Sequence, residues 1–139
     1  MNALTPTILT IVGITGDLSK RKLLPALATL AAAHALPEQF RIVGITRQKT
    51  VTLDSLLESV EGAEDIRKYI GIFPMSLTEQ TEYERLKAYL LTIEQELGGS
   101  PQHLWYLSVP PETAWPIIEQ LGTSGLSKAP GTKLLVEKP

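Results

Sequence analysis

The chain has 139 residues, which is the length of one ordinary domain with a sizeable core, and we expect a single domain over residues 1–139. Hydrophobic residues make up 43% and charged residues 20%, as is typical of a globular protein, and the net charge of -2 gives no overall positive field for binding a nucleic acid. Cysteine is absent, which excludes disulfides, thiolate metal sites and cysteine nucleophiles, and the two histidines lack the spacing of metal ligands.

The N-terminal segment shows no targeting signal. No positive charge precedes the apolar run 8–14, and this run is too short for a transmembrane helix. From these features we expect a cytoplasmic protein with no membrane partner.

Strands and helices are predicted to alternate along the chain. Short runs rich in β-branched and apolar residues predict buried strands at residues 7–12, 41–46, 69–75, 103–109 and 132–136. Apolar residues at helical spacing predict a helix of about four turns from residue 18 and further helices at residues 53–60, 78–97 and 112–121.

The first helix is expected to be irregular. Leu23, Leu27 and Leu30 form its predicted apolar stripe. Pro25 lies inside the helix and removes one backbone hydrogen bond, so we expect a kink or a restart there.

Polar residues mark the starts of two later helices. Thr52 or Asp54 is expected near the start of the second helix. Thr78, with Thr81 or Glu82 a turn later, resembles the N-terminal cap of the third.

This alternation through short loops indicates an α/β fold, a doubly wound parallel sheet with helices on both faces in three α/β/α layers. Because crossovers between parallel strands are right-handed, we expect the strand order 3-2-1-4-5. It is the Rossmann-like architecture of NAD(P)-binding domains, in which ligands bind at the carboxyl ends of the strands where the strand order reverses.

Residues 13–18, Gly-Ile-Thr-Gly-Asp-Leu, join the first strand to the first helix at that edge. Glycine lets the backbone approach phosphates closely, and a helix N-terminus offers free N–H groups that suit a pyrophosphate. Only the first glycine of the common G-x-G-x-x-G pattern is present, because Thr15 and Leu18 replace the others and Gly16 is additional. A tight turn without a ligand, with Asp17 as a helix cap, stays open as an alternative.

The end of the second strand indicates which dinucleotide would bind. An acidic residue there usually contacts a free ribose 2′-hydroxyl, whereas an arginine accommodates a 2′-phosphate. Here Arg47 can make two hydrogen bonds to a phosphate, Gln48 can donate one, and Lys49 adds a second cation. These residues favour NADP over NAD, and a charged surface loop is the alternative.

Residues 13–27 run GITGDLSKRKLLPAL and resemble the opening signature of glucose-6-phosphate dehydrogenases, which is G-x-x-G-D-L, a basic cluster, a leucine and P-A-L. Further segments resemble the family in the same order: a G-x-x-R segment at 44–47, a third strand and loop at 69–77, a segment at 105–111 that resembles Y-L-A-x-P-P, and an E-K-P motif at 137–139. In the 105–111 segment, Ser108 and Val109 replace the usual alanine and leucine. The resemblance covers essentially the whole chain.

The resemblance implies NADP as cofactor and assigns roles to particular residues. The residues that match the turn holding the pyrophosphate are Gly13, Thr15, Gly16, Asp17 and Leu18. Arg47 matches the arginine that binds the 2′-phosphate, and Gln48 stands beside it where the family has a small polar residue. The residues that match the loop on the nicotinamide side are Ser108, Val109 and Pro110. Lys138 matches a lysine that reaches both substrate and cofactor.

The family implied by this resemblance transfers a hydride from C1 of glucose 6-phosphate to NADP+, giving 6-phosphogluconolactone in the oxidative pentose phosphate pathway, and its full-length members form homo-oligomers. Its general base is a histidine in an R-x-D-H-Y-L-G-K motif that this chain lacks. His34 and His103 do not fit and are expected to be structural or exposed. No catalytic residue is therefore expected, and the chain should bind NADP without catalysing the reaction.

The substrate-binding part of such an enzyme is expected to lie outside this chain. Apolar surface near Trp105, Trp115 and the last strand should then be exposed. Two other hypotheses remain: a stand-alone module that binds a dinucleotide without catalysis, and a doubly wound domain with no nucleotide role.

Overall fold

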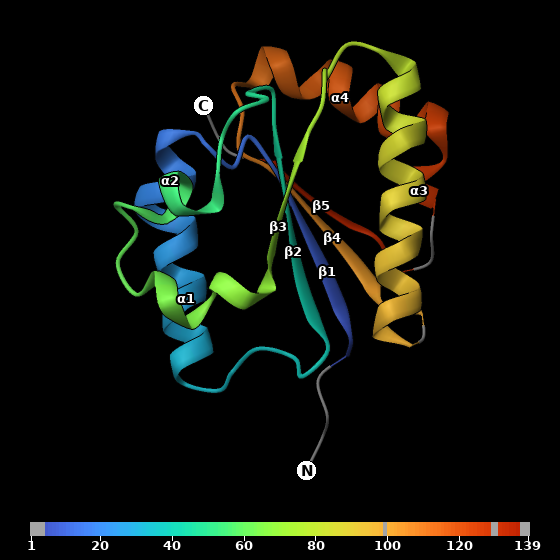
Figure 1. The fold of residues 1–139 in the computed structure, drawn as a ribbon. Helices are drawn as coiled ribbons and strands as arrows, with labels where there is room; N and C mark the ends of the chain where they lie inside the picture. The colour runs from blue at the N-terminus through green and yellow to red at the C-terminus, as the bar shows by residue number, and fades with distance from the viewer. Residues whose placement is uncertain (1–4, 99, 129–130, 137–139) are drawn as a thin grey trace.

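A five-stranded parallel sheet forms the centre of the molecule. The computed structural model describes residues 5–98, 100–128 and 131–136. The strands are β1 (Thr7–Val12), β2 (Phe40–Thr46), β3 (Ile70–Pro74), β4 (Gln102–Leu107) and β5 (Lys133–Val136). Their order across the sheet is β3-β2-β1-β4-β5, with every neighbouring pair parallel, which confirms the predicted doubly wound order (Figure 1).

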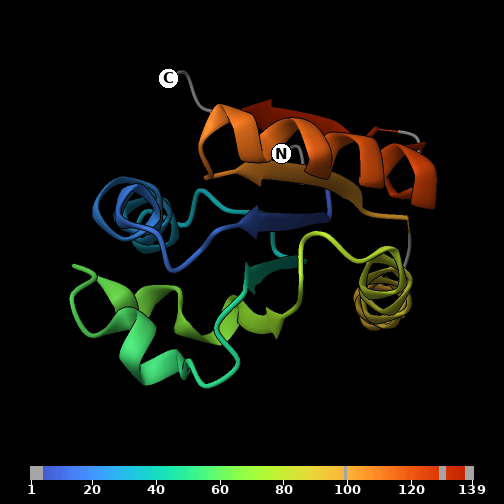
Figure 2. The same cartoon turned by 90° about the horizontal axis from the view of Figure 1, so that it is seen from above.

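Helices cover both faces of this sheet, as predicted. The α-helices are α1 (Leu24–Ala32), α2 (Leu53–Leu57), α3 (Gln80–Leu97) and α4 (Pro111–Ser124). Viewed from above, α1 and α3 lie on opposite sides of the strands (Figure 2). Three single turns of 3-10 helix occupy Ala63–Asp65, Arg67–Tyr69 and Leu126–Lys128.

Two hydrophobic clusters fill the space between the layers, one on each face of the sheet. All six residues of β1 are buried, and alternate side chains enter different clusters. Ile8 packs with side chains of α3 and α4, whereas Ile11 packs with side chains of α1 and α2. Burial of each such side chain stabilises the fold by roughly 1.5–3 kcal/mol. The clusters hold the carboxyl ends of the central strands in fixed register, with Val12 beside both Ile45 and Leu107.

The first helix restarts where the sequence predicted. A π-helical turn occupies Ser19–Leu23, and α1 follows with Pro25 in its first turn, where the missing N–H leaves no gap in the hydrogen bonding. The expectation that Leu30 joins the buried stripe is wrong, because its side chain is 43% exposed. A π turn holds more residues than an α turn, so it rotates the later residues, and Leu24, Leu27 and Ala28 face the sheet.

The predicted helix starts have mixed outcomes. Thr52 is the N-cap of α2, and its side chain accepts a hydrogen bond from the Ser55 backbone N–H. The predicted cap at Thr78 is wrong, because α3 begins at Gln80 without a side-chain cap bond and the Thr78 hydroxyl lies 3.2 Å from that of Ser76. The predicted helix over 53–60 ends at Leu57, and the one over 112–121 extends to Ser124.

The predicted exposed apolar surface is partly present. Trp115 is 67% exposed, and Leu134, Leu135 and Val136 of the edge strand β5 are exposed too. Trp105 is fully buried in the sheet, so that part of the prediction is wrong. The reason is its inner position in β4, where it stands beside Thr10 of β1.

Candidate functional site

A tight turn after β1 lies at the carboxyl edge of the sheet. Gly13 has φ +87°, and its N–H, like that of Ile14, donates to the Ile45 carbonyl at the end of β2. The Gly16 N–H then donates to the Gly13 carbonyl over 2.9 Å. These bonds tie the turn to β2 and lead the chain directly into the first helix. The N–H groups of that first helical turn lack partners within the helix, so this edge is suited to an anion.

The loop after β4 lies against the same turn. The Ser108 N–H donates to the Val12 carbonyl, and a Cβ atom built on Gly13 would lie 2.5 Å from the Ser108 carbonyl oxygen and 3.1 Å from a Val109 methyl. Only glycine fits this close approach. Pro110 follows as the N-cap residue of α4. The structure thus brings the predicted turn residues and the predicted loop residues side by side.

The other residues of the turn point in different directions. The Thr15 hydroxyl lies 3.4 Å from the Thr46 hydroxyl at the end of β2. The carboxylate of Asp17 pairs with Arg21 one turn later, so the interpretation of Asp17 as a helix cap is wrong. Leu18 is exposed.

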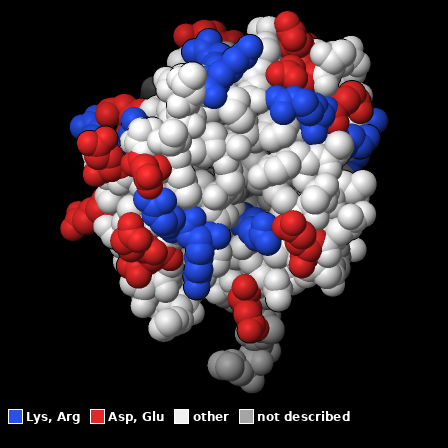
Figure 3. All heavy atoms as spheres, in the orientation of Figure 1, with Lys and Arg blue, Asp and Glu red and all other residues white. Residues whose placement is uncertain are grey.

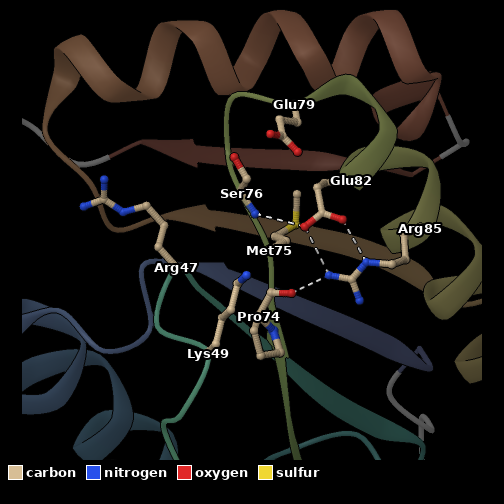
Figure 4. Close-up of a pocket in the computed structure, with 8 residues that line it drawn as sticks. All are labelled: Arg47, Lys49, Pro74, Met75, Ser76, Glu79, Glu82 and Arg85. Carbon is tan, nitrogen blue, oxygen red and sulfur yellow. Dashed lines mark hydrogen bonds and ion pairs between the residues drawn. The ribbon is translucent and has the colours of Figure 1, made fainter.

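A cavity of about 610 Å³ opens beside the turn, between the ends of β2 and β3 and the start of α3 (Figure 4). Its lining residues are Arg47, Lys49, Pro74, Met75, Ser76, Glu79, Glu82 and Arg85. Gln48 lies between Arg47 and Lys49, and its backbone N–H donates to the Thr46 hydroxyl at the end of β2. This bond holds the segment that carries the two cations. Within the described ranges, Arg47 and Lys49 form no ion pair with a carboxylate. Both cations are therefore available to an anionic ligand.

The sequence analysis missed most of this lining. Pro74 ends β3, Met75 and Ser76 follow it, and three charged residues come from the N-cap and the first turns of α3. The position of Pro74, Met75 and Ser76 at the end of the third strand could have indicated them, because the carboxyl ends of parallel strands lie at the same edge of a sheet. Glu82 was noted only as part of a helix cap, and no local motif marks Arg85; both line the cavity through contacts between segments.

The two histidines, which were not expected to belong to the site, lie away from this edge. His103 is the second residue of β4, at its amino end, and its Nε2 atom lies 2.9 Å from a Glu94 carboxylate oxygen. His103 is buried and its partner Glu94 is partly exposed, so the pair fits the expectation that His103 is structural. His34 is exposed just after α1. Lys138 lies outside the described residues.

Metal ligands and membrane-spanning helices are two further features to consider among the described residues. No group of three or more potential ligands there is arranged for a metal ion. Among the described helices, none is both long and apolar enough to cross a bilayer. Figure 3 shows acidic and basic side chains interspersed on the face it presents, with no broad basic surface.

Comparison with known proteins decides the family. The family model described as "Glucose-6-phosphate dehydrogenase, NAD binding domain" matches residues 10–139. This chain belongs to that family. Relatives within the glucose-6-phosphate dehydrogenases include the glucose-6-phosphate 1-dehydrogenase of Chlamydia muridarum, 29% identical over 99% of this chain, and that of Bacillus subtilis, 27% identical over 95%.

Solved structures of glucose-6-phosphate dehydrogenases share the fold. One, described as in complex with its substrate glucose-6-phosphate, has a TM-score of 0.87 and 25% identity over 100% of this chain. Another, from Mycobacterium avium, has a TM-score of 0.77 and 25% identity over 96%. The chain spans 31% of the Chlamydia muridarum relative, 29% of the Bacillus subtilis relative and 32% of the first structure.

Proposed function

We propose that this chain is the NADP-binding domain of a glucose-6-phosphate dehydrogenase and that residues 1–139 act as one dinucleotide-binding unit. The whole protein would transfer a hydride from C1 of glucose 6-phosphate to NADP+, giving 6-phosphogluconolactone. The observation that carries the proposal is the glycine turn packed against the loop after β4, beside two cations without carboxylate partners among the described residues. The family membership supports the same function.

The site residues fit a dinucleotide along the carboxyl edge. The backbone of Gly13, Thr15, Gly16, Asp17 and Leu18 would bind the pyrophosphate, since a side chain at Gly13 would fill the space next to Ser108. Arg47 would bind the 2′-phosphate with Lys49 as a second cation and Gln48 beside them. Ser108, Val109 and Pro110 would border the nicotinamide half.

The nicotinamide supplies the redox chemistry when bound, and this chain's residues bind and orient it. The reaction also needs a general base for the hydroxyl proton of the sugar. Neither histidine of the chain lies at the candidate site, because His103 pairs with Glu94 at the other end of β4 and His34 follows α1. We therefore propose that the chain binds NADP and that the base belongs to another part of the protein. Lys138 would contact both substrate and cofactor.

Compartment and assembly stay predictions. The cytoplasm is the expected compartment, although one matched relative is a chloroplastic enzyme of Arabidopsis thaliana. A homo-oligomer of the whole protein is expected from the family resemblance. The net charge of -2 supports the expectation that nucleic acid is not a partner.

Titration of the chain with NADP and with NAD by calorimetry tests the proposal. In Arg47→Ala, NADP binding should weaken by about 10- to 100-fold, because a charge-assisted contact to the 2′-phosphate is lost. NAD binding should change little, since NAD lacks that phosphate. Arg41→Ala is the matched control: Arg41 lies on the same strand at its other end, where it pairs with Glu96. A folded chain that binds neither dinucleotide would contradict the proposal.

A further inference from the structure

The end of β3 and the loop after it form one wall of the 610 Å³ cavity. We call Pro74, Met75 and Ser76 the β3 wall. The Met75 N–H donates to the Thr46 carbonyl over 2.9 Å, so the wall is joined to the end of β2. Met75 is buried and lines the cavity with an apolar, polarisable side chain.

Arg85 and Glu82 of α3 hold this wall on both sides of Met75 (Figure 4). The Arg85 guanidinium donates to the Pro74 carbonyl and, through Nε, to a Glu82 carboxylate oxygen at 2.9 Å. The other Glu82 oxygen accepts the Ser76 N–H at 3.2 Å. Two side chains thus satisfy the backbone groups on either side of the residue that lines the cavity.

Arg85 is fixed in this position by packing. Its guanidinium lies over the ring of Phe73, 4.2 Å from the centroid, and Phe73 belongs to the hydrophobic cluster beneath α3. Hydrogen bonds from Arg85 and from the Ser76 backbone lower the pKa of Glu82. Glu82 is therefore an ionised acceptor at neutral pH, and the two charges neutralise each other.

This neutralisation matters for the cations across the cavity. Lys49 and Glu82 line the same cavity, and the charge of Lys49 makes a small contribution to the lowered pKa of Glu82. Without Arg85, the Glu82 carboxylate would be an unpaired anion near Lys49 and would compete with a phosphate for it. Arg85 thus both holds the wall and removes a competitor for Lys49.

We propose that Arg85 and Glu82 are positioning residues for the adenosine half of the dinucleotide: they hold the β3 wall against the adenine ring and keep the Glu82 carboxylate away from Lys49. The inference rests on the proposed function and extends it. The β3 wall should contribute equally to the binding of NADP and of NAD, because both carry adenine. The protection of Lys49 serves only the ligand with a 2′-phosphate.

The test compares NADP, NAD and 2′,5′-ADP binding to Arg85→Ala, Glu82→Ala and the double variant by calorimetry. In Arg85→Ala, NAD binding should weaken by about tenfold from loss of the wall, and NADP and 2′,5′-ADP binding by about 30-fold because of the freed carboxylate. In the double variant the extra threefold or so should disappear, since no competing carboxylate remains. The loss of about tenfold that all three ligands share should remain in the double variant. A purely structural role would not produce this ligand-selective recovery.

The matched control is another ion pair of α3. Arg41 of β2 pairs with Glu96 of α3 at 2.9 Å, at the amino end of the strands. Arg41→Ala removes a similar exposed pair between elements that also border the cavity, and it should leave all three affinities unchanged. Arg85→Lys covers the case in which Arg85→Ala fails to fold. It keeps the charge and one hydrogen bond, so its losses should be smaller.

Amide hydrogen exchange of the free chain gives a readout without any ligand. The Ser76 N–H donates to Glu82, so its exchange should accelerate in Glu82→Ala and stay unchanged in Arg41→Ala. If Arg85 and Glu82 variants bind like Arg41→Ala while Arg47→Ala loses NADP selectively, the inference fails and the proposed function stands. If the folded chain binds no dinucleotide, both fail.

Discussion

At the residue scale, the geometry of the candidate site depends on the absence of a side chain at Gly13. Its φ of +87° lies in the left-handed region, and the space beyond its Cα is filled by the Ser108 carbonyl. Both features occur where β1 and β4 lie side by side, because the segments that follow these two strands pack against each other. Under the proposed function, phosphate binding by backbone N–H groups would require this close packing of the two loops.

Gly13→Ala should destabilise the chain and abolish dinucleotide binding. The left-handed φ alone costs about 1–2 kcal/mol, and the contact of 2.5 Å with a backbone oxygen forces the two loops apart, which adds to the loss. The measurements are urea unfolding and NADP titration.

Gly98→Ala is the control for Gly13→Ala. Gly98 also has a left-handed φ, +69°, but no atom lies within 4 Å of its added Cβ. This variant should lose about 1–2 kcal/mol and keep its NADP affinity. Equal binding losses in the two variants would show that strain anywhere in the fold, and not the contact at Ser108, controls the site.

At the element scale, helix starts show what local sequence can encode. Thr52 and Ser55 form a reciprocal capping box at the start of α2, and four residues of sequence suffice to specify it. Thr78 carries a similar pattern, yet its hydroxyl bonds within the loop to Ser76. In this loop the Ser76 N–H donates to Glu82, and α3 begins at Gln80, two residues after Thr78.

Thr52→Ala should therefore destabilise the chain by about 1 kcal/mol, which is typical for loss of an N-cap side chain. Thr78→Ala should cost clearly less, since no cap bond is removed. Thermal unfolding of the two variants provides the comparison. A larger loss in Thr78→Ala would mean that Thr78 acts as the cap in solution.

Most of the fold could be predicted from the sequence because its signals are local. The six buried residues of β1, the glycine turn and the absence of an acid after β2 are each contained in one short segment. Arg85 and Glu82 could not be found this way, because their contacts join α3 to the β3 wall across a loop. Leu30 was misplaced for a related reason, as the π turn before it rotates the helix.

At the scale of the whole molecule, one side of the sheet holds a buried ionisable group in its hydrophobic cluster. Tyr83 of α3 is almost fully buried, and its hydroxyl donates to the Leu77 carbonyl over 2.8 Å. Burial raises the pKa of Tyr83 to about 12 from its ordinary value of 10. The cluster that unites α3, α4 and the sheet thus contains a proton that the folded chain retains more tightly than the unfolded chain.

This difference predicts alkaline destabilisation of the fold. A group with a raised folded pKa contributes stability that is fully present below the unfolded pKa, near 10, and is lost as pH rises through the folded pKa, near 12. The free energy of unfolding should fall by up to about 1.4 kcal/mol per pH unit in that window from Tyr83 alone. In Tyr83→Phe the hydroxyl is absent, so the variant should start less stable, by about 1 kcal/mol from the lost hydrogen bond, and fall less steeply. Urea unfolding at pH 9, 10 and 11 measures both slopes, and parallel slopes would mean that other groups cause the alkaline loss.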